Sequence, residues 1–248
     1  MLIFRPIKTN ALTQGFGQNL ACVYPGTYKI VGKYGNVCPT GSIPFYPTIG
    51  LDGHNGFDLA TIKDEGVFFN VIADTKWRTT EQIDSAGGIT LNVYSVEPIK
   101  VPKPDGPIAR ATWAAGGEKL HVRFIYVHAK QNIDRPDGTV TPGAHIQVSD
   151  SSGASGGNHV HFGMKYVTKD GMTLDYSNGY RGYVDPTPFY RNTFILDAMI
   201  DDAFLKAQIG SITELHRQLD VAALGNKESI VQHIERILLT VRRFFNRR

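Results

Sequence analysis

The chain changes from a loop to a strand within residues 149–166, which read SDSSGASGGNHVHFGMKY. The Gly- and Ser-rich first half favours turns, and we predict a strand over Asn158–Tyr166. Residues two apart in a strand point to the same face, so His159 and His161 should project side by side while Val160 points away into packing. Two such imidazoles can both bind a metal, or one can bind it while the other transfers protons or forms a hydrogen bond.

Working outward, residues 1–190 read as short strands separated by turns, which predicts a mainly β, antiparallel structure. Further strands are expected at Val67–Ala73, Ile89–Val96 and Leu120–His128. The proline-rich segment Lys100–Gly106 cannot lie inside a sheet, and Arg135–Gly138 has the residues of a β-turn. Residues 20–50, rich in Gly, Pro and Tyr, are expected to form a long loop, which in a compact domain is usually functional or an insertion.

Residues 191–248 follow a helical period instead, which predicts a division into a β domain (1–190) and a helical C-terminal region. Their apolar side chains recur at three and four residues: Ile230, Val231, Ile234, Ile237, Leu238, Val241 and Phe245. A weaker helical pattern covers 194–208. We expect these helices to pack on the β domain or to pair with themselves. A basic end that contacts another protein, the cell wall or an anionic membrane surface is the alternative.

Composition sets limits on the function. The chain has 248 residues, 42% hydrophobic and 20% charged, with a net charge of +3, as in ordinary globular proteins. Six basic and two acidic residues lie within 226–248, so the rest is close to neutral and is not expected to bind nucleic acid. No stretch approaches 18 apolar residues, so no transmembrane helix is predicted. The apolar run Met1–Phe4 is too short for a signal-peptide core, so any export would need another route.

The two cysteines, Cys22 and Cys38, lie in the long segment 20–50. Their spacing is not that of a zinc or redox motif. They either form one disulfide or are two free thiols, because sequence does not give the Cα separation that a bridge requires.

Two other segments carry chemistry. His54-Asn55-Gly56-Phe57-Asp58 places an imidazole and a carboxylate four residues apart, and Tyr126-Val127-His128 lies in a predicted strand. Two histidines and one aspartate are three zinc ligands that leave a fourth position for water, the pattern of a catalytic zinc site. Taken singly, His128 is more often a half-buried strand histidine, and His54 with Asp58 a loop hydrogen bond. His121, His145, His216 and His233 are expected on the surface or in the tail.

In this order, the motifs resemble those of the M23 family, the lysostaphin/LytM-type zinc metallopeptidases that cleave peptidoglycan. The family pattern is His-x-x-x-Asp, then Tyr-x-His, then a Gly/Ser-rich loop with His-x-His. The resemblance covers roughly residues 10–190. Lesser landmarks agree with it: Thr13–Gly17, Val71–Ala73, Val140–Gly143 and Val184–Tyr190.

The resemblance implies one zinc ion per chain, held by His54, Asp58 and His161, with His128 and His159 as the catalytic pair. It also implies a two-layer antiparallel β-structure of the LytM/lysostaphin type, with the site in a groove between loops. The expected activity is that of a peptidoglycan endopeptidase whose partner is a peptidoglycan peptide. It would act on the cell wall from an extracellular, periplasmic or virion-associated position, and the chain could be phage-encoded.

The chain also departs from the family pattern. Ala129 stands where Leu is usual, Gly163 where an acidic residue often follows, and 20–50, Trp77–Ala86 and 100–118 resemble insertions. These differences concern substrate fit, because loops set the choice of substrate in such a groove. The alternative hypothesis is a catalytically silent module that binds peptidoglycan or serves as a virion, assembly or hydrolase-activator protein. The presence of all five site residues favours the enzyme.

Overall fold

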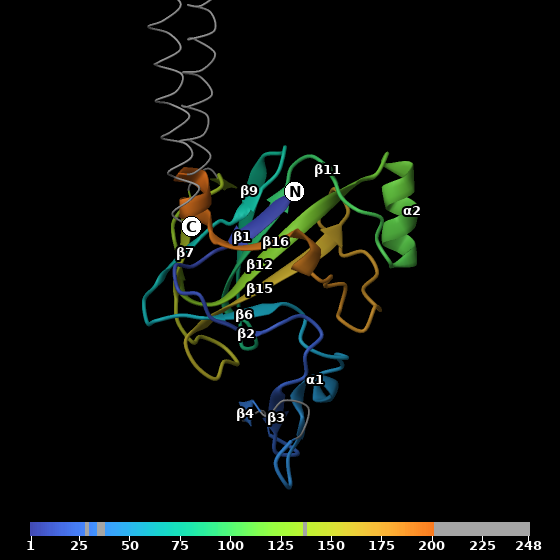
Figure 1. Cartoon of the computed structure of the whole chain (residues 1–248). Coiled ribbons are helices and arrows are strands. Elements are labelled where there is room, and N and C mark those ends of the chain that lie inside the picture. Colours follow the sequence, from blue (N-terminus) through green and yellow to red (C-terminus); the bar gives the residue numbers. More distant parts are fainter. Residues whose placement is uncertain (28–29, 34–37, 136–137, 201–248) are drawn as a thin grey trace, which may run out of the picture. The chain divides into compact units, whose positions relative to one another are not determined.

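A computed structural model describes residues 1–27, 30–33, 38–135 and 138–200 (Figure 1). The chain divides into two units, Met1–Ile195 and Leu196–Arg248. Within the described residues, none of the helices has the length and apolar character needed to cross a membrane.

The first unit is built around a large antiparallel sheet, as the alternating sequence pattern predicts. Its main path runs in the order β13-β9-β10-β12-β15-β6-β2, with β11, β14 and β7 attached to its side. The bounds along the path are β13 Thr139–Val140, β9 Trp77–Asp84, β10 Gly88–Ser95, β12 Lys119–Asn132, β15 His159–Val167, β6 Phe57–Ala60 and β2 Leu12–Gln14. The attached strands are β11 Ile99–Lys100, β14 His145–Ser149 and β7 Gly66–Phe68.

In the two central strands, β12 and β15, successive side chains alternate between the core and the opposite face of the sheet. Directly paired residues share a face, and Phe124 of β12 lies opposite Met164 of β15, while Tyr126 lies opposite Phe162. All four are fully buried in the hydrophobic core. The other face of β15 therefore carries His159, His161, Gly163 and Lys165, so the same alternation that builds the core also gathers one row of side chains on the opposite face of the strand.

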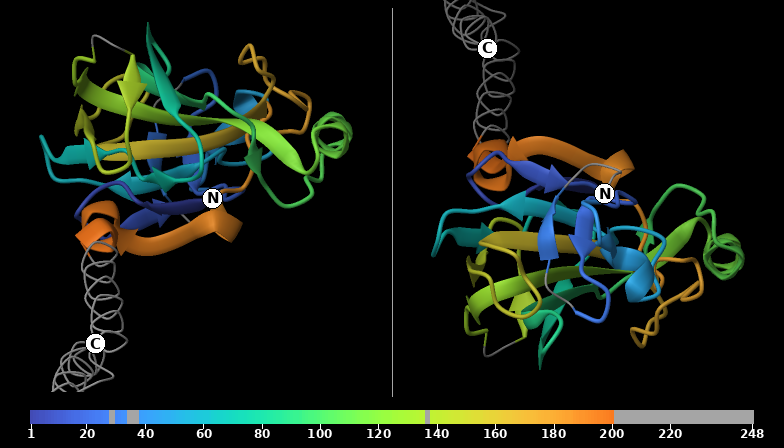
Figure 2. Two further views of the ribbon diagram at one scale, coloured as in Figure 1. Left: turned by 90° about the horizontal axis from the view of Figure 1, so that it is seen from above. Right: turned by 90° about the horizontal axis from the view of Figure 1, so that it is seen from below.

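A second, three-stranded sheet covers the core side of the large sheet. It has the order β16-β1-β8, with β16 Tyr190–Phe194, β1 Leu2–Arg5 and β8 Val71–Ile72. Ile3 and Val71 from this sheet belong to the same hydrophobic core as Phe124. Figure 2 shows β1 and β16 as a separate layer beside the large sheet, so the predicted two-layer, mainly β fold is confirmed.

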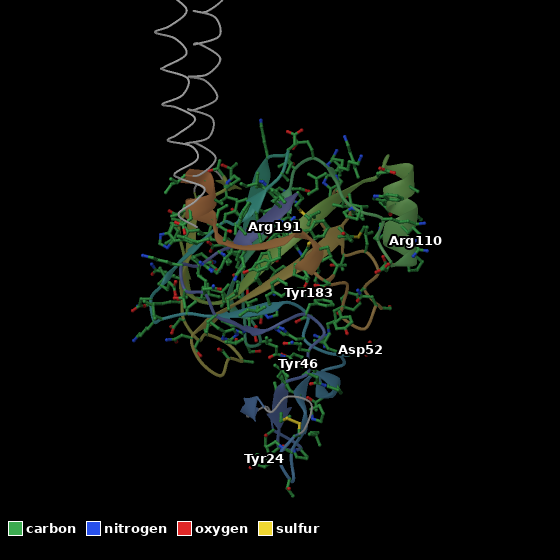
Figure 3. The ribbon with its side chains drawn as sticks, in the orientation of Figure 1. Tyr24, Tyr46, Asp52, Arg110, Tyr183 and Arg191 are labelled. Carbon is green, nitrogen blue, oxygen red and sulfur yellow. A yellow bond between two sulfur atoms is a disulfide. The ribbon has the colours of Figure 1, made fainter. Side chains whose placement is uncertain are left out.

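Residues 20–50 were expected to form a loop, and this expectation was wrong. They contain a third sheet of order β4-β3-β5, with β3 Ala21–Val23, β4 Ile30–Lys33 and β5 Ile43–Pro44, followed by the short helix α1 Phe45–Thr48. Ala21, Tyr46 and Leu51 form a small apolar cluster of their own. A disulfide joins Cys22 to Cys38, and the yellow bond in Figure 3 marks it. Strand pairing, a bridge and a small core thus order a segment whose composition predicts only turns.

One other expected strand is wrong, and one helix was not predicted. The run Val67–Ala73 is not one strand, because its parts pair with different partners: β7 with β14, and β8 with β1. The 100–118 segment contains a helix, α2 Pro107–Ala115, at whose start Asp175 accepts hydrogen bonds from the backbone N–H groups of Ile108 and Ala109. A carboxylate at that position satisfies two unpaired donors of the first helical turn. A loop distant in sequence provides this cap.

Residues 195–200 are helical and follow β16, which pairs with β1. The helix predicted over 194–208 is therefore described only at its beginning. The helix predicted around Ile230–Phe245 lies outside the described residues, as does most of the predicted helical region 191–248. The division after residue 190 stays a prediction.

The cystine gives a first prediction. Thiol titration of the unfolded, unreduced protein should detect no free thiol, and the reduced protein should show two. Because the bridge closes a segment with a sequence separation of 16, replacing both cysteines with serine should lower the free energy of unfolding by about 3 kcal/mol. Urea denaturation of both proteins measures this difference, and two free thiols in the native preparation would contradict the bridge.

Candidate metal centre

Two adjacent strands and one loop bring three polar side chains to one point. Asp58 of β6 lies directly opposite His161 of β15, so their side chains share a face of the sheet. His54 comes from the loop before β6, where its backbone N–H donates to the carbonyl of Gln18 and its own carbonyl accepts from the N–H of Gly17. These two bonds fix the loop beside the strand, so the third side chain also reaches the point where the other two meet.

The three side chains form a tight triangle of nitrogen and oxygen atoms. The Asp58 Oδ1 atom lies 3.1 Å from Nε2 of His54 and 3.1 Å from Nδ1 of His161, and these two nitrogens are 3.0 Å apart. His54 is 2% exposed, Asp58 7% and His161 8%. Burying three such groups together is costly unless their charges and lone pairs are satisfied, and a divalent cation does this.

The triangle fits a zinc ion. Nitrogen and oxygen ligands arranged tetrahedrally at zinc lie about 3.3 Å from one another, close to the distances between these atoms. Nδ1 of His54 is 3.1 Å from the carbonyl oxygen of Gly15, which requires the proton on Nδ1 and leaves the lone pair on Nε2. Among the described residues, His54, Asp58 and His161 form a group that could hold a metal ion. This buried two-histidine, one-aspartate group is consistent with a zinc site.

Electrostatics keep the carboxylate ready to bind a cation. Burial alone would raise the pKa of Asp58, but the charges and hydrogen bonds of His54 and His161 hold it well below its usual range. Burial also lowers the pKa of His161, and the neighbouring His54 acts in the same direction. At neutral pH the Asp58 carboxylate is therefore ionised and the neutral form of the His161 imidazole is favoured, which are the protonation states a metal requires of these two ligands.

A β-bulge brings His128 to the same face. Val127 pairs with His161, so an unbroken strand would turn His128 toward the core. β12 also pairs with β10, where Leu91 lies opposite Tyr126 and Ile89 lies opposite Ala129. Two residues of β10 thus correspond to three of β12, so β12 carries one extra residue between Tyr126 and Ala129. His128 itself has φ 70°, in the left-handed region. The bulge turns the His128 side chain to the face that carries His159, and the centres of the two rings are 4.7 Å apart.

His128 and His159 are held in the same way. Nδ1 of His128 lies 2.7 Å from the carbonyl oxygen of Ser152, and Nδ1 of His159 lies 2.8 Å from that of Gly157. Each carbonyl fixes the proton on Nδ1, so Nε2 is the nitrogen that can accept a proton. Nε2 of His159 lies 3.6 Å from Oδ1 of Asp58. Burial, followed by the neighbouring His159 and His161, lowers the pKa of His128 to about 4.

Two glycines make room for the cluster. A Cβ atom on Gly56 would lie 2.5 Å from the carbonyl oxygen of Phe162 and 2.8 Å from Nε2 of His161. A Cβ atom on Gly163 would lie 2.4 Å from the ring of Tyr183. Gly163 is the position where an acidic residue was expected from the resemblance, and here the Tyr183 ring takes the space of that side chain.

Tyr46 is a neighbour of the site that the motifs do not predict. Its ring centre lies 5.5 Å from that of His54, and its hydroxyl accepts a hydrogen bond from Nε2 of Gln14 at 2.9 Å. Gln14 of β2 pairs directly with Asp58. Burial, followed by the charge of Asp58, raises the pKa of Tyr46. Figure 3 shows Tyr46 between the small sheet and the large one, so the 20–50 segment forms a wall of the site.

The structure brings together all five residues that the sequence analysis selected. His121 lies elsewhere on β12, with Nδ1 3.3 Å from the carbonyl oxygen of Ser95, and His145 lies on β14 against the Phe68 ring. His216 and His233 lie outside the described residues. Which of the five bind metal and which act on a substrate stays a prediction.

No protein-family model matches the chain, and no curated protein has a significant sequence match to it. Among solved structures, it is similar to the catalytic domain of the antimicrobial peptidase lysostaphin from Staphylococcus simulans (18% identity, TM-score 0.34), over 56% of this chain and 79% of that one. It is also similar to a zinc-containing peptidase from Vibrio cholerae (15% identity, TM-score 0.40), over 75% of this chain but only 39% of that one.

A third similarity is to the catalytic domain of the prophage-encoded M23 protein EnpA from Enterococcus faecalis. The identity is 19% and the TM-score 0.30, over 68% of this chain and 96% of that one. All three TM-scores lie below 0.5, so a function for this chain has to be argued from its own residues.

The close packing at Gly56 gives a second prediction. Gly56→Ala places a methyl group against Nε2 of His161 and should displace that ring, so that zinc bound per chain falls to less than half of the wild-type value. Gly156→Ala is the matched control, because a Cβ atom there has no neighbour within 4 Å, and it should retain the metal. Metal analysis after dialysis measures both, and equal zinc contents would show that the packing at Gly56 does not position His161.

The pKa of His128 gives a third prediction, for the metal-free protein. A histidine with a pKa near 6.5 in the unfolded chain and about 4 in the fold takes up its proton preferentially on unfolding. Stability from this group is complete above pH 6.5 and is lost as the pH falls toward 4. His128→Gln should therefore reduce the loss between pH 7 and pH 5 by about 2 kcal/mol. Denaturation at both pH values tests this, and parallel losses in wild type and variant would contradict it.

Proposed function

We propose that this protein is a zinc-dependent endopeptidase that hydrolyses peptide bonds in bacterial peptidoglycan. One observation carries the proposal: a triangle of potential zinc ligands and two further imidazoles, each fixed by a backbone carbonyl, share one face of the sheet. The motifs that hold these residues follow the order of the M23 peptidoglycan hydrolases. A purely structural histidine cluster would not need five side chains oriented toward one point.

In this proposal, His54, Asp58 and His161 hold the zinc ion. When bound, the ion would supply Lewis-acid chemistry at a peptide carbonyl and lower the pKa of water toward neutrality. Two of the three residues lie on the paired strands β6 and β15, and His54 lies in a loop held by backbone hydrogen bonds to Gly17 and Gln18. Little rearrangement is therefore needed for the ligand atoms to bind a cation.

His128 and His159 move protons. With Nδ1 of each ring donating to a backbone carbonyl, Nε2 of one imidazole takes a proton from the attacking water, and the same or the other ring returns it to the leaving amine. A protonated ring also donates to the oxygen of the tetrahedral intermediate. The Ser152 carbonyl accepts from Nδ1–H of His128 and acts against the burial that lowers the pKa of this ring, and the Gly157 carbonyl orients the His159 ring.

Muropeptide release tests the activity directly. Purified sacculi with different cross-link types are incubated with the protein, with and without a zinc chelator, and the products are identified by mass spectrometry. Chelator-sensitive appearance of new amino and carboxyl termini is the expected result, and the products identify the bond. If zinc-loaded protein releases nothing from any sacculus, the silent binding or assembly module becomes the better description.

Single substitutions separate the two roles. His161→Ala should lose both zinc and activity, whereas His128→Ala should retain zinc and lose activity by a factor of about 10² to 10⁴, the usual contribution of a general acid or base. His121→Ala, on the same strand but away from the cluster, is the control and should retain both. Zinc content and rates on a released muropeptide measure the effects. Equal zinc loss in the His161 and His128 variants would overturn the assigned roles.

A further inference from the structure

A hollow lies next to Tyr183, whose ring also contacts that of His161. It has a volume of about 420 Å³ and is lined by residues 102–106, α2, the end of β15 and the segment 174–189. Pockets for small molecules usually measure about 300–1,000 Å³, so it can hold a ligand of moderate size. In Figure 1, α2 and the loop that follows β15 lie next to each other at one end of the large sheet. We refer to this hollow as the α2 cavity.

Five aromatic residues line the α2 cavity: Phe16, Tyr166, Tyr180, Tyr183 and Phe189. Phe16 and Tyr180 pack together with ring centres 4.6 Å apart. The Asn178 side chain holds the loop that carries two of the tyrosines, accepting from the N–H of Tyr180 and donating to the carbonyl of Tyr183. The cavity thus combines apolar rings with three tyrosine hydroxyl groups, and the loop holds two of these tyrosines in place.

Charges of both signs line the cavity. Its charged lining residues are Lys103, Asp105, Asp175 and Asp185. The Asp175 carboxylate already accepts two hydrogen bonds from backbone N–H groups in the first turn of α2. A charged ligand would meet a like charge, whereas a neutral ligand with hydroxyl and amide groups would find both donors and acceptors. A pyranose ring has this character, because its apolar C–H face packs on aromatic rings while its hydroxyl groups point outward.

The cavity and the metal centre share a wall. Tyr183 lines the cavity, and its ring centre lies 6.5 Å from that of His161 in an edge-on arrangement. Lys165 also contacts the Tyr183 ring, since its Nζ atom lies 4.0 Å from the ring centre. The same Nζ atom donates a hydrogen bond to the carbonyl oxygen of Arg181. A ligand that packs on Tyr183 is therefore one ring away from a candidate zinc ligand.

We propose that the α2 cavity binds an N-acetylhexosamine of the glycan strand while the metal centre acts on the attached peptide. This inference rests on the proposed function, since in peptidoglycan the stem peptide is linked to such a sugar. The cavity would make the sugar part of the substrate and favour peptides that still carry it. The helix in 100–118, which the sequence marks as an insertion, would then be a specificity element.

Direct binding tests the cavity without relying on hydrolysis. The full-length protein, freed of metal, is titrated calorimetrically with di-N-acetylchitobiose, a neutral saccharide without peptide. Tyr180→Ala should weaken binding about tenfold and Lys103→Ala about threefold, because each removes one type of contact. The control is Tyr24→Ala, at an exposed tyrosine directly after β3 that does not line the cavity, and this variant should bind as wild type. Circular dichroism confirms folding, and Lys103→Ala, on an exposed side chain, remains informative if Tyr180→Ala does not fold.

Hydrolysis provides the second arm. Rates are compared on a disaccharide-linked stem peptide and on the same peptide without sugar, and Tyr180→Ala should lower kcat/KM for the first substrate only. Absence of saccharide binding at millimolar concentration, or an equal loss on both substrates, would overturn the inference. So would binding of the bare peptide with the same dependence on Tyr180, which would assign the cavity to peptide. Saccharide binding that depends on Tyr180 in a protein without peptidase activity would support the cavity while rejecting the proposed function.

Discussion

The Asp58 carboxylate lies between two imidazoles, with Oδ1 3.1 Å from a nitrogen of each, and all three groups are almost excluded from solvent. Such a cluster is expensive to bury, and the fold around it supplies the compensation. Direct pairing of β6 with β15 fixes two of the groups, and backbone hydrogen bonds to the β2 side fix the third. The glycines at 56 and 163 are needed because the surrounding atoms leave no room for a Cβ atom.

The alternation of side chains along the strands of the large sheet both builds the core and places the histidines on the opposite face. Large apolar residues of β12 and β15 fill the core between the two sheets, and the histidines occupy the opposite face. The bulge in β12 is the exception that completes the site, since it turns His128 out of the core row and onto the histidine face. A positive φ at a non-glycine residue costs conformational energy, and strain of this kind is commonly found at functional sites.

The segments added to the sheet determine what surrounds the cluster. The disulfide-linked 20–50 segment brings Tyr46 against His54, and the segment after β15 brings Tyr183 against His161. Each tyrosine contacts a different candidate metal ligand, and neither belongs to one of the three motifs. The sheet therefore holds the candidate metal ligands, and the loops and added segments provide the side chains around them.

The sequence by itself determined the β character of the first 190 residues, the face on which His159 and His161 meet, and the identity of the five clustered side chains. The first two follow from strand periodicity. The five side chains were selected from the donor preferences of zinc together with the order of the motifs, which resembles that of the M23 family. It did not reveal the third sheet, the Cys22–Cys38 bridge, helix α2 or the neighbours Tyr46 and Tyr183. Strict strand parity would even have placed His128 on the wrong face. Each of these depends on pairings between distant segments, and only the tertiary structure decides which strands meet, where a register slips by one residue and which ring fills the space beside a glycine.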